Sequence, residues 1–475
     1  MTEFNNKTIA VIGLARSGLA CCDVLTQLGA HVIPYDGKPA ALLTEAVAHL
    51  SALGLSPLTD GAVLDYSKLD YVVTSPGVRK DAAVLQDAVA AGVPVLGEIE
   101  AAYRIARAPI LAITGTNGKT TTTMLLGEML KAAGIKTYIA GNIAAGDIAL
   151  PLIQAAFDAP PDAAIVAEIS SFQLEWISTF RPKVAALLNI SPDHGDRQTW
   201  EEYVAAKWRI FENQTKEDCA VISDDLDRSA NSKLKKAPGL TFALDQSDEF
   251  MVYSFGENII VEFTRNAPVP EYELCQVSEI KLPGRHNIEN IMAATAMALG
   301  FGIGIEPVRQ VATTFTGVVH RLEYVETISG VKYVNNSMCT NADAFAKSLE
   351  ALPEPKVVIA GGVFKGGNVA TVADAVVQNN VKALVLIGRS APQIEDAARA
   401  AGYGAVSQAG TLVEAVTLAA SLAQPGETVL LAPACASFDM FADFEDRGDQ
   451  FKAAVRGLRT PPARASLPPL LGKGN

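Results

Sequence analysis

The chain has 475 residues, which at roughly 150 residues per domain predicts about three domains. Its net charge of −13 argues against binding to nucleic acid, whose phosphates require a basic surface. With 49% hydrophobic and 19% charged residues, the chain is expected to fold rather than stay disordered. The 6 cysteines lack zinc-type spacing, and neither a secretory signal nor a membrane-spanning stretch is visible, so we expect a cytoplasmic protein without membrane insertion.

The first block of strand and helix patterns covers residues 1–108. Its opening, KTIAVIGLARSGLACCDVLTQLGAHVIPYD, predicts a strand, a helix and a second strand that ends at Asp36. The spacing of Gly13 and Gly18 departs from the dinucleotide fingerprint, because Ala15 stands where a second glycine is needed. The hypothesis of an NAD-dependent oxidoreductase therefore rests on this unit alone, and Ala15 argues against it. We expect the stretches LDYVVTSPGV and VPVLGEIE to continue the sheet.

The second block, residues 109–318, opens with a strand that leads into a phosphate-binding loop. The loop pattern G-x-x-x-x-G-K-[ST] is satisfied at Gly118, Lys119 and Thr120, but Ile113 stands where the first glycine belongs. Backbone N–H groups and the Lys119 ammonium are predicted to hold phosphate, and Thr120 to offer its hydroxyl to Mg²⁺. Two further strands run into polar residues, in PDAAIVAEISSFQLE and PKVAALLNISPDH. The stretch LPGRHNIENIMAATAMALG predicts an amphipathic helix.

The third block, residues 319–460, again alternates strands with helices. Its predicted strands are GVKYVNNS, PKVVIAGG, VKALVLIG and ETVLLAPA, and TLVEAVTLAASLA predicts a helix. The tail, residues 461–475, is rich in proline and small residues and is expected to be disordered. The predicted fold is α/β with three domains: an N-terminal Rossmann-like domain, a central P-loop ATPase domain with a mainly parallel sheet, and a C-terminal Rossmann-like domain.

Short motifs then follow one another along the chain: TGTNGKTT (114–121), GNIA (141–144), EISSFQLE (168–175), NISPDHGDR (189–197), YVAAKWRIFENQ (203–214), LPGRHNIENIMAA (282–294), FTGVVHRLE (315–323) and APACASFDMFADFEDRGDQF (432–451). In this order they resemble the Mur ligase family, the ATP-dependent amide-bond ligases of peptidoglycan synthesis. The resemblance runs from about residue 8 to residue 457, and the last motif is similar to that of the family member that adds D-glutamate.

The resemblance implies an ATP site with two Mg²⁺ ions. Its catalytic residues would be Lys119, Glu168, His194 and Lys207, and its metal ligands Thr120, Glu168, His194 and Lys207, the lysine as a carbamate formed with CO₂. Three of these residues have an alternative interpretation. Glu168 is also suited to cap a helix, His194 to lie on the surface and Lys207 to face solvent. The implied nucleotide contacts are Gly115, Thr116, Asn117, Gly118, Lys119, Thr120, Thr121, Asn287, Asn290, Arg321 and Asn336.

The same resemblance assigns the outer domains to the two other substrates. It implies contacts with the UDP-linked substrate by Arg16, Asp36, Lys38, Ser75 and Asn142. It implies contacts with the amino acid by Thr340, Lys365, Ser437 and Phe444, where a cation, two hydroxyls and an aromatic ring suit a dicarboxylate with a short methylene stem. Alternatively, Thr340 caps a helix and Phe444 belongs to the core.

The stretch NNSMCTN (335–341) departs from the family pattern Asn-Asp-Ser-Lys-Ala-Thr-Asn. Asn336 replaces the aspartate that holds the ATP ribose in relatives, Met338 replaces the lysine and Cys339 replaces the alanine. The stretch GGVFKGGN likewise lacks the aspartate that usually follows its glycines. These departures leave the nucleotide contacts and the stereochemistry of the acceptor open.

The resemblance thus implies a monomeric ligase that adds D-glutamate to UDP-N-acetylmuramoyl-L-alanine through an acyl phosphate. Two alternatives stay open beside the oxidoreductase: a sister ligase that uses L-glutamate or another amine, and a non-catalytic nucleotide-binding protein. The presence of Lys119, Glu168, His194 and Lys207 argues against the second of these.

Overall fold

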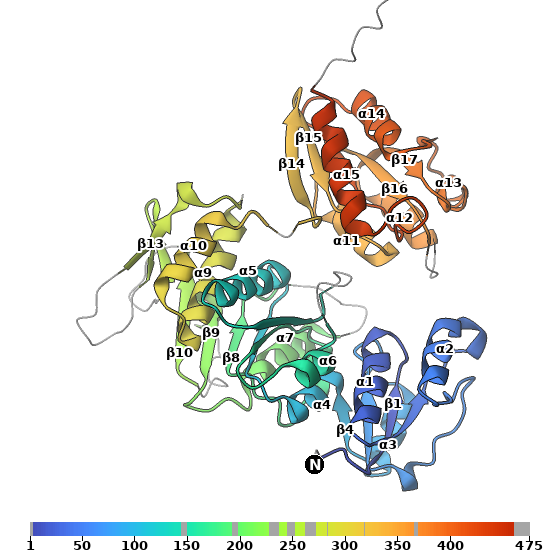
Figure 1. Ribbon diagram of the computed structural model, residues 1–475, viewed down its shortest axis with the longest axis vertical. Helices are drawn as coiled ribbons and strands as arrows, with labels where there is room; N and C mark the ends of the chain where they lie inside the picture. The colour runs from blue at the N-terminus through green and yellow to red at the C-terminus, as the bar shows by residue number, and fades with distance from the viewer. Residues whose placement is uncertain are drawn as a thin grey trace, which may run out of the picture. The chain divides into compact units, whose positions relative to one another are not determined.

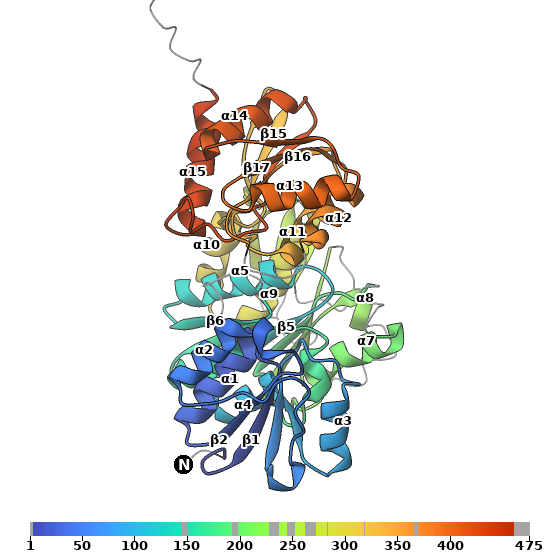
Figure 2. The ribbon, with the colours of Figure 1, turned by 90° about the vertical axis from the view of Figure 1, so that its right-hand side faces the viewer.

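The structure is a computed structural model, shown as a ribbon in two orthogonal views (Figures 1 and 2), and it describes the following residues: 3–143, 150–191, 198–227, 237–244, 252–261, 272–282, 284–317, 319–364 and 369–459. They form two compact units, one ending at Thr316 and the other beginning at Gly317. The tail at 461–475, expected to be disordered, lies outside the described residues.

The first unit begins with a four-stranded parallel sheet of order β2-β1-β3-β4. This sheet is Rossmann-like, as predicted, and its chain order reverses between β1 and β3, where such folds place their ligand crevice. Its elements are β1 (Thr8–Ile12), α1 (Arg16–Gln27), β2 (His31–Tyr35), η1 (Ala40–Leu42), α2 (Thr44–Ala52), η2 (Tyr66–Lys68), β3 (Tyr71–Thr74), α3 (Ala83–Ala90), β4 (Val95–Gly97) and α4 (Glu98–Ile105).

The prediction of a strand through VPVLGEIE is wrong in its second half. The strand ends at Gly97, and α4 begins at Glu98. Two acidic residues, Glu98 and Glu100, lie in the first turn of this helix, where negative side chains are favoured by the helix dipole. Glu98 and Glu100 are two positions apart, which is also the spacing of side chains on one face of a strand. The sequence pattern therefore predicted a strand here instead of a helix.

A nine-stranded sheet of order β13-β12-β11-β10-β9-β8-β5-β7-β6 follows in the same unit. It is mainly parallel, as predicted, but the sequence pattern missed the antiparallel strands β11 to β13 at one edge. Its strands are β5 (Ile110–Thr114), β6 (Thr137–Gly141), β7 (Ala164–Glu168), β8 (Val184–Leu187), β9 (Cys219–Ser223), β10 (Gly239–Ala243), β11 (Val252–Phe255), β12 (Asn258–Val261) and β13 (Tyr272–Gln276). Its helices are α5 (Lys119–Ala132), α6 (Leu152–Asp158), η4 (Gln173–Trp176), α7 (Trp200–Trp208), η5 (Arg209–Phe211), α8 (Asp224–Asp227), η7 (Val277–Glu279), α9 (Arg285–Phe301) and α10 (Ile305–Thr314).

Helix α9 is not amphipathic along its whole length, contrary to the prediction. Every residue from Asn290 to Ala298 is buried, because α9 packs against α5 and also against β8, β9 and β10. A helix that is covered on all sides lacks the exposed polar stripe that produces the periodic signal.

The two sheets of the first unit share one hydrophobic core. Helices α1 and α4 pack on α6, and Leu25, Ile99 and Leu152 belong to the same buried cluster as Ile165 of β7. Burial of this shared surface joins the N-terminal and central parts into one unit.

The second unit contains a six-stranded sheet of order β14-β15-β19-β16-β17-β18, parallel except for β14. Helices α11, α12 and α13 cover one face and α14 and α15 the other, each over its own core. The elements are β14 (Glu323–Ile328), β15 (Val331–Asn335), α11 (Ala342–Glu350), β16 (Lys356–Gly361), α12 (Ala370–Gln378), β17 (Val381–Ile387), α13 (Ala391–Ala400), β18 (Val406–Gln408), α14 (Leu412–Leu422), β19 (Thr428–Leu431) and α15 (Phe444–Gly457).

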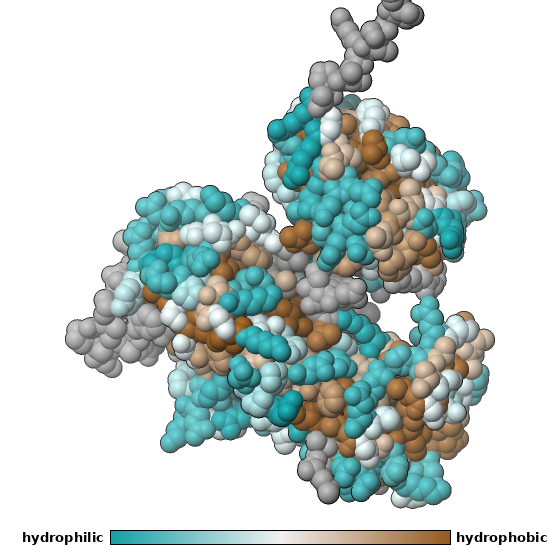
Figure 3. Space-filling model, in the orientation of Figure 1, coloured by the Kyte–Doolittle hydropathy of each residue, from teal (hydrophilic) through white to brown (hydrophobic). Residues whose placement is uncertain are grey.

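The surface in view carries hydrophilic and hydrophobic residues side by side (Figure 3). Such mixing is ordinary for a folded protein, since polar surface does not suffice to cover it. Among the described residues, no helix combines the length and the hydropathy that crossing a membrane requires.

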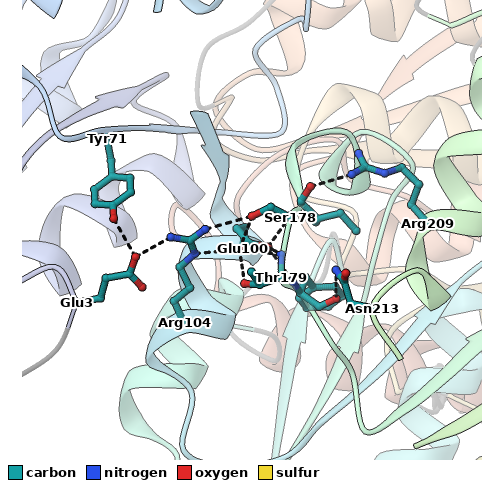
Figure 4. Close-up of polar contacts among 10 residues, drawn as sticks. Glu3, Tyr71, Glu100, Arg104, Ser178, Thr179, Arg209 and Asn213 are labelled. Carbon is teal, nitrogen blue, oxygen red and sulfur yellow. Dashed lines mark hydrogen bonds and ion pairs between the residues drawn. The ribbon is translucent and has the colours of Figure 1, made fainter. Parts of the chain in front are cut away.

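A buried carboxylate anchors α4 on the loop between η4 and β8 (Figure 4). Oε2 of Glu100 accepts the backbone N–H groups of Ser178 (2.9 Å), Thr179 (3.0 Å) and Phe180 (2.8 Å), and Arg104 donates to Oε1 (2.9 Å). Burial alone would raise the pKa of Glu100, but these N–H groups, the Thr179 hydroxyl and the Arg104 guanidinium lower it to about 2.

Glu100→Gln should therefore destabilise the first unit by about 3 kcal/mol at neutral pH. The folded-state pKa lies below the ordinary 4.5, so the carboxylate stabilises fully above that value and the effect is lost as the pH falls toward 2. Urea unfolding of both proteins at several pH values measures this difference. It should stay constant down to about pH 5 and shrink below it. A pH-independent difference would contradict the role of the charge.

Candidate functional site

The phosphate-binding loop connects β5 to α5, as predicted. Ile113 is fully buried inside β5 and pairs with Glu168 of β7, so the strand extends over the position of the missing glycine and the loop is short. Gly115 and Gly118 have φ angles of 156° and 82°, which only glycine adopts readily. Lys119 Nζ donates to the carbonyls of Gly115 (2.9 Å) and Thr116 (2.8 Å), so the lysine lies against the loop that it is predicted to serve.

Helix α9 approaches the same loop through two asparagines predicted for the nucleotide site. A Cβ at Gly118 would lie 2.2 Å from Asn290 Oδ1, so the loop and α9 are in direct contact. Asn290 Nδ2 donates to Asn287 Oδ1 at 3.0 Å, and Thr122 donates to Asn290 at 3.3 Å. The structure thus brings Asn287 and Asn290, far along the chain, to the start of α5.

Thr120 and Glu168 lie together at the ends of α5 and β7. The Thr120 hydroxyl donates to Glu168 Oε2 at 2.6 Å, and the carboxylate is 4% exposed. Glu168 is not the N-cap residue of η4, which is Phe172, four positions further on. A hydroxyl and a carboxylate are hard oxygen ligands of the kind that Mg²⁺ prefers, so this pair fits the predicted metal.

Lys207 does not face solvent, and that alternative is wrong. It lies on α7, is 2% exposed and donates from Nζ to Gly115 O at 2.8 Å. Its Nζ also lies 4.5 Å from the centre of the Tyr203 ring. Lys119 and Lys207 therefore donate to the same carbonyl oxygen, and two cations meet at the loop where phosphate is expected.

Two residues of this site were missed from the sequence. Asn189, just beyond β8, accepts the N–H of Asn117 (2.8 Å) and donates to the Asn117 carbonyl (3.1 Å), as a neighbouring strand would. The Tyr203 hydroxyl lies 2.9 Å from Thr116 Oγ1. The signal for Asn189 was its position after a strand, but only the pairing of β8 with β5 places it against the loop.

The crevice of the first sheet holds residues predicted for the UDP-linked substrate. Ser75 donates to Gly13 O at 2.7 Å across the point where the strand order reverses. Asp36 accepts the N–H groups of Leu14 (3.0 Å) and Lys38 (3.0 Å), and Arg16 begins α1. These residues follow β1, β2 and β3 directly, at one edge of the sheet.

Asn142 lies beside Glu168, and a separately lined cavity lies beside α7. The N–H of Asn142 donates to Glu168 O at 2.8 Å, so this residue adjoins the metal candidate. The cavity measures about 690 Å³, and it is lined by Arg79 of the loop after β3, Phe172 beside η4 and Ala206 of α7.

In the second unit, the predicted amino-acid residues lie beyond the carboxyl ends of its strands. Ser437 follows β19 and is 2% exposed, whereas Phe444 begins α15, is half-buried and is not a core residue. Thr340 precedes α11 but does not cap it, because the side chain of Asn341 accepts the Ala344 N–H at 2.8 Å. That alternative for Thr340 is therefore wrong.

Asn336 is engaged on both sides of its amide. Its Oδ1 accepts the Leu322 N–H at 3.1 Å, and its Nδ2 donates to Ser348 Oγ at 2.6 Å. Together with Arg321 and Met338 it lines a cavity of about 210 Å³ in the second unit. A neutral amide suits this setting, because one end donates and the other accepts.

His194 and Lys365 lie outside the described residues. Within the described ranges, histidine, cysteine and carboxylate side chains form no cluster of at least three that could hold a metal ion. Of the residues predicted as metal ligands, the described part of the chain brings Thr120 and Glu168 into contact.

Family models match three successive parts of the chain. They are the models for the Mur ligase MurD-like N-terminal domain (residues 7–97), the Mur ligase middle domain (113–298) and the Mur ligase glutamate ligase domain (320–435).

Individual relatives give the same result. The UDP-N-acetylmuramoylalanine--D-glutamate ligase of Caldanaerobacter subterraneus subsp. tengcongensis is 42% identical over 96% of this chain and 100% of its own. The enzyme of the same name from Pelotomaculum thermopropionicum is 44% identical over 97% of this chain and 99% of its own. The solved UDP-N-acetylmuramate-alanine ligase of Thermotoga maritima is 18% identical, with a TM-score of 0.48 over 95% of this chain and 100% of that chain.

Proposed function

The chain belongs to the Mur ligase family and is an ATP-dependent ligase, and we propose that it joins D-glutamate to UDP-N-acetylmuramoyl-L-alanine. The observation that carries the proposal is the convergence of Lys119, Thr120, Glu168 and Lys207 on one loop, in a chain 42% identical to a ligase of that name. The sister-ligase and oxidoreductase hypotheses have no comparable support.

The reaction proceeds in two steps that this site suits. ATP transfers its γ-phosphoryl group to the alanine carboxylate, which gives an acyl phosphate and ADP. The glutamate amine then attacks the acyl carbon, and the tetrahedral intermediate expels phosphate as the amide forms and a proton leaves the nitrogen. The alternative hypothesis is a nucleotide-binding protein without turnover. Such a protein would not need a second, buried lysine at the loop, so Lys207 favours the ligase.

Charge stabilisation is the main task of the chain's own residues. The Lys119 ammonium and the N–H groups at the start of α5 stabilise the oxygens of the transferring phosphoryl group. Ligases of this family use ATP and Mg²⁺, and Thr120 and Glu168 would hold the ion, which supplies further positive charge at those oxygens. We propose a second Mg²⁺ position shared by His194 and Lys207.

Lys207 is proposed to act as a carbamate. A carbamate keeps one N–H, which suffices to retain the bond to Gly115 O while the new carboxylate serves as an anionic ligand. Burial penalises the charged form of a lysine, and this side chain is 2% exposed.

The two remaining substrates are assigned to the two Rossmann-like folds. Arg16, Asp36, Lys38, Ser75 and Asn142 are proposed to contact the UDP-linked substrate in the β1/β3 crevice and beside Glu168. Thr340, Lys365, Ser437 and Phe444 are proposed to bind D-glutamate.

Arg321 and Asn336 are proposed to contact the nucleotide, together with Gly115 to Thr121, Asn287 and Asn290. We propose domain limits at 1–108, 109–318 and 319–460. All proposed residues belong to one chain, so a monomer suffices, and ATP and the UDP-linked substrate point to the cytoplasm.

Phosphate release with UDP-N-acetylmuramoyl-L-alanine, ATP and each glutamate enantiomer in turn tests the function. D-glutamate should support turnover, and L-glutamate should support less than about 1% of it, the scale of a misplaced reacting group. Equal rates with both enantiomers would contradict D-glutamate as the specific acceptor. Absence of phosphate release with either enantiomer would refute the proposed ligase reaction.

Ser437→Ala should weaken binding of the amino acid and leave ATP binding unchanged. Loss of one hydrogen bond to a carboxylate costs about 1.5 kcal/mol, so the KM for D-glutamate should rise about tenfold. Initial rates at varied glutamate and varied ATP separate the two constants. Ser421→Ala, at an exposed position of α14 in the same unit, is the control. A change in the KM for ATP alone would show that Ser437 does not bind the amino acid.

A further inference from the structure

The segment of residues 171–180, which follows Glu168, is attached to both ends of α7. At the start of α7, Gln198 Oε1 accepts the Ser171 hydroxyl at 2.9 Å, and Gln198 Nε2 donates to Glu175 Oε1 at 2.6 Å. The helix between these attachments has nine residues and carries Lys207 in its last turn. Its place therefore depends on what holds its ends.

Arg209 makes the attachment at the other end. Its Nη1 donates to the carbonyls of Leu174 (2.7 Å) and Glu175 (2.7 Å), and its Nη2 donates to that of Ile177 (2.8 Å). These carbonyls lie at the end of η4, where a helix leaves its last acceptors without partners. The same guanidinium pairs with Glu212 at 2.8 Å, which fixes its plane.

The 171–180 segment is itself held by the opposite charge. Glu100 accepts the N–H groups of Ser178, Thr179 and Phe180, as Figure 4 shows beside the contact of Arg209. Asn213, four residues beyond Arg209, donates to the Phe180 carbonyl at 3.1 Å. A cation thus holds the carbonyls of the segment and an anion holds its N–H groups, so the segment has little freedom to move.

We propose that Arg209 is a positioning residue, which sets Lys207 relative to Glu168 by joining α7 to the 171–180 segment. The inference rests on the proposed role of Lys207 and deepens it. Lys207 lies two residues before Arg209, and Glu168 lies three residues before Ser171, so the attachments of Arg209 and Gln198 adjoin both metal candidates. A displacement of about 1 Å in such a site costs up to about 100-fold in rate.

Arg209→Lys tests the geometry, because a lysine keeps the charge but lacks the planar fork that reaches three carbonyls. We expect kcat to fall at least about tenfold and the half-saturating Mg²⁺ concentration to rise several-fold. The KM for the UDP-linked substrate should stay within about twofold, because the β1/β3 crevice is not altered.

Arg309→Lys is the matched control. Arg309 donates to two backbone carbonyls, those of Leu274 (2.8 Å) and Glu273 (2.8 Å), and pairs with Glu306 three residues away. Its side chain is 37% exposed, against 32% for Arg209. Both variants should lower the midpoint of thermal unfolding similarly, and Arg309→Lys should keep its kcat and its Mg²⁺ dependence.

A second readout does not need turnover. Calorimetric titration with AMP-PNP, an ATP analogue that cannot transfer its γ-phosphoryl group, measures the Mg²⁺ dependence of nucleotide binding. Arg209→Lys should need more Mg²⁺ and Arg309→Lys should match the wild type. If wild type lacks ligase activity while this difference persists, the proposed function fails and the positioning role stands.

Two results would overturn the inference. One is an Arg209→Lys protein that loses thermal stability only, with kcat and Mg²⁺ dependence like those of Arg309→Lys. If Arg209→Lys does not fold, Gln198→Ala is the second variant. It removes the attachment at the start of α7, which consists of side-chain hydrogen bonds alone, and it should raise the half-saturating Mg²⁺ concentration. An unchanged Mg²⁺ dependence in that variant would also refute the role.

Discussion

Lys119→Ala should lower the rate of phosphate release at least about 100-fold, the scale of losing one preorganised charge in an active site. The lysine donates to Gly115 O and Thr116 O at the start of α5, where N–H groups already favour an anion. Its removal takes away the mobile charge that can follow the phosphoryl group during transfer. The KM for D-glutamate should change little, because the ammonium is assigned to ATP alone.

The fold should survive this change. Lys119 is half-buried, and its bonds to Gly115 O and Thr116 O lie within its own loop, so their loss should lower the unfolding free energy by about 1 kcal/mol or less. Lys131→Ala, on the exposed end of α5 where it pairs with Glu128, is the control and should keep full activity. Near-normal phosphate release from Lys119→Ala would refute the ATP site, whatever the control does.

The predicted site residues that the structure brings together within one loop, or at the end of one strand, are those whose sequence signal is local. Lys119 and Thr120 belong to one loop pattern, and Glu168 ends an apolar strand where a carboxylate is costly unless it has a partner. The alternation of strands and helices likewise predicted the three sheets, because period-2 and period-3.6 patterns survive in most elements.

The contacts that sequence analysis missed join distant parts of the chain. Lys207 and Gly115 are 92 positions apart, and Asn189 and Asn117 are 72 apart. Which strand lies beside β5 decides these contacts, and no local pattern contains the strand order. Glu100 resembled the outward residue of a strand, whereas its chemistry comes from three N–H groups nearly eighty positions away.

Lys207 gives the sharpest test of the proposed chemistry. If it acts as a carbamate, Lys207→Arg should be inactive, because a guanidinium stays protonated and does not take up CO₂ at neutral pH. Lys207→Ala should lose activity at least about 100-fold, and acetate should restore part of it by supplying a carboxylate in the vacated space. If the lysine acts as a cation instead, methylamine should restore activity and acetate should not.

Burial of Lys207 demands a matched control, since any substitution at a side chain that is 2% exposed also alters packing. Lys356, the first residue of β16 in the second unit, is 1% exposed and donates to the Asn379 carbonyl. Lys356→Ala should lose thermal stability like Lys207→Ala but keep kcat, and acetate should not affect it. The carbamate predicts that acetate, but not methylamine, rescues Lys207→Ala, and that Lys356→Ala responds to neither. This combination of results would show that Lys207 acts as an anionic ligand. Activity of Lys207→Arg near the wild-type level would refute the carbamate, because the bond to Gly115 O and the charge would then account for the lysine.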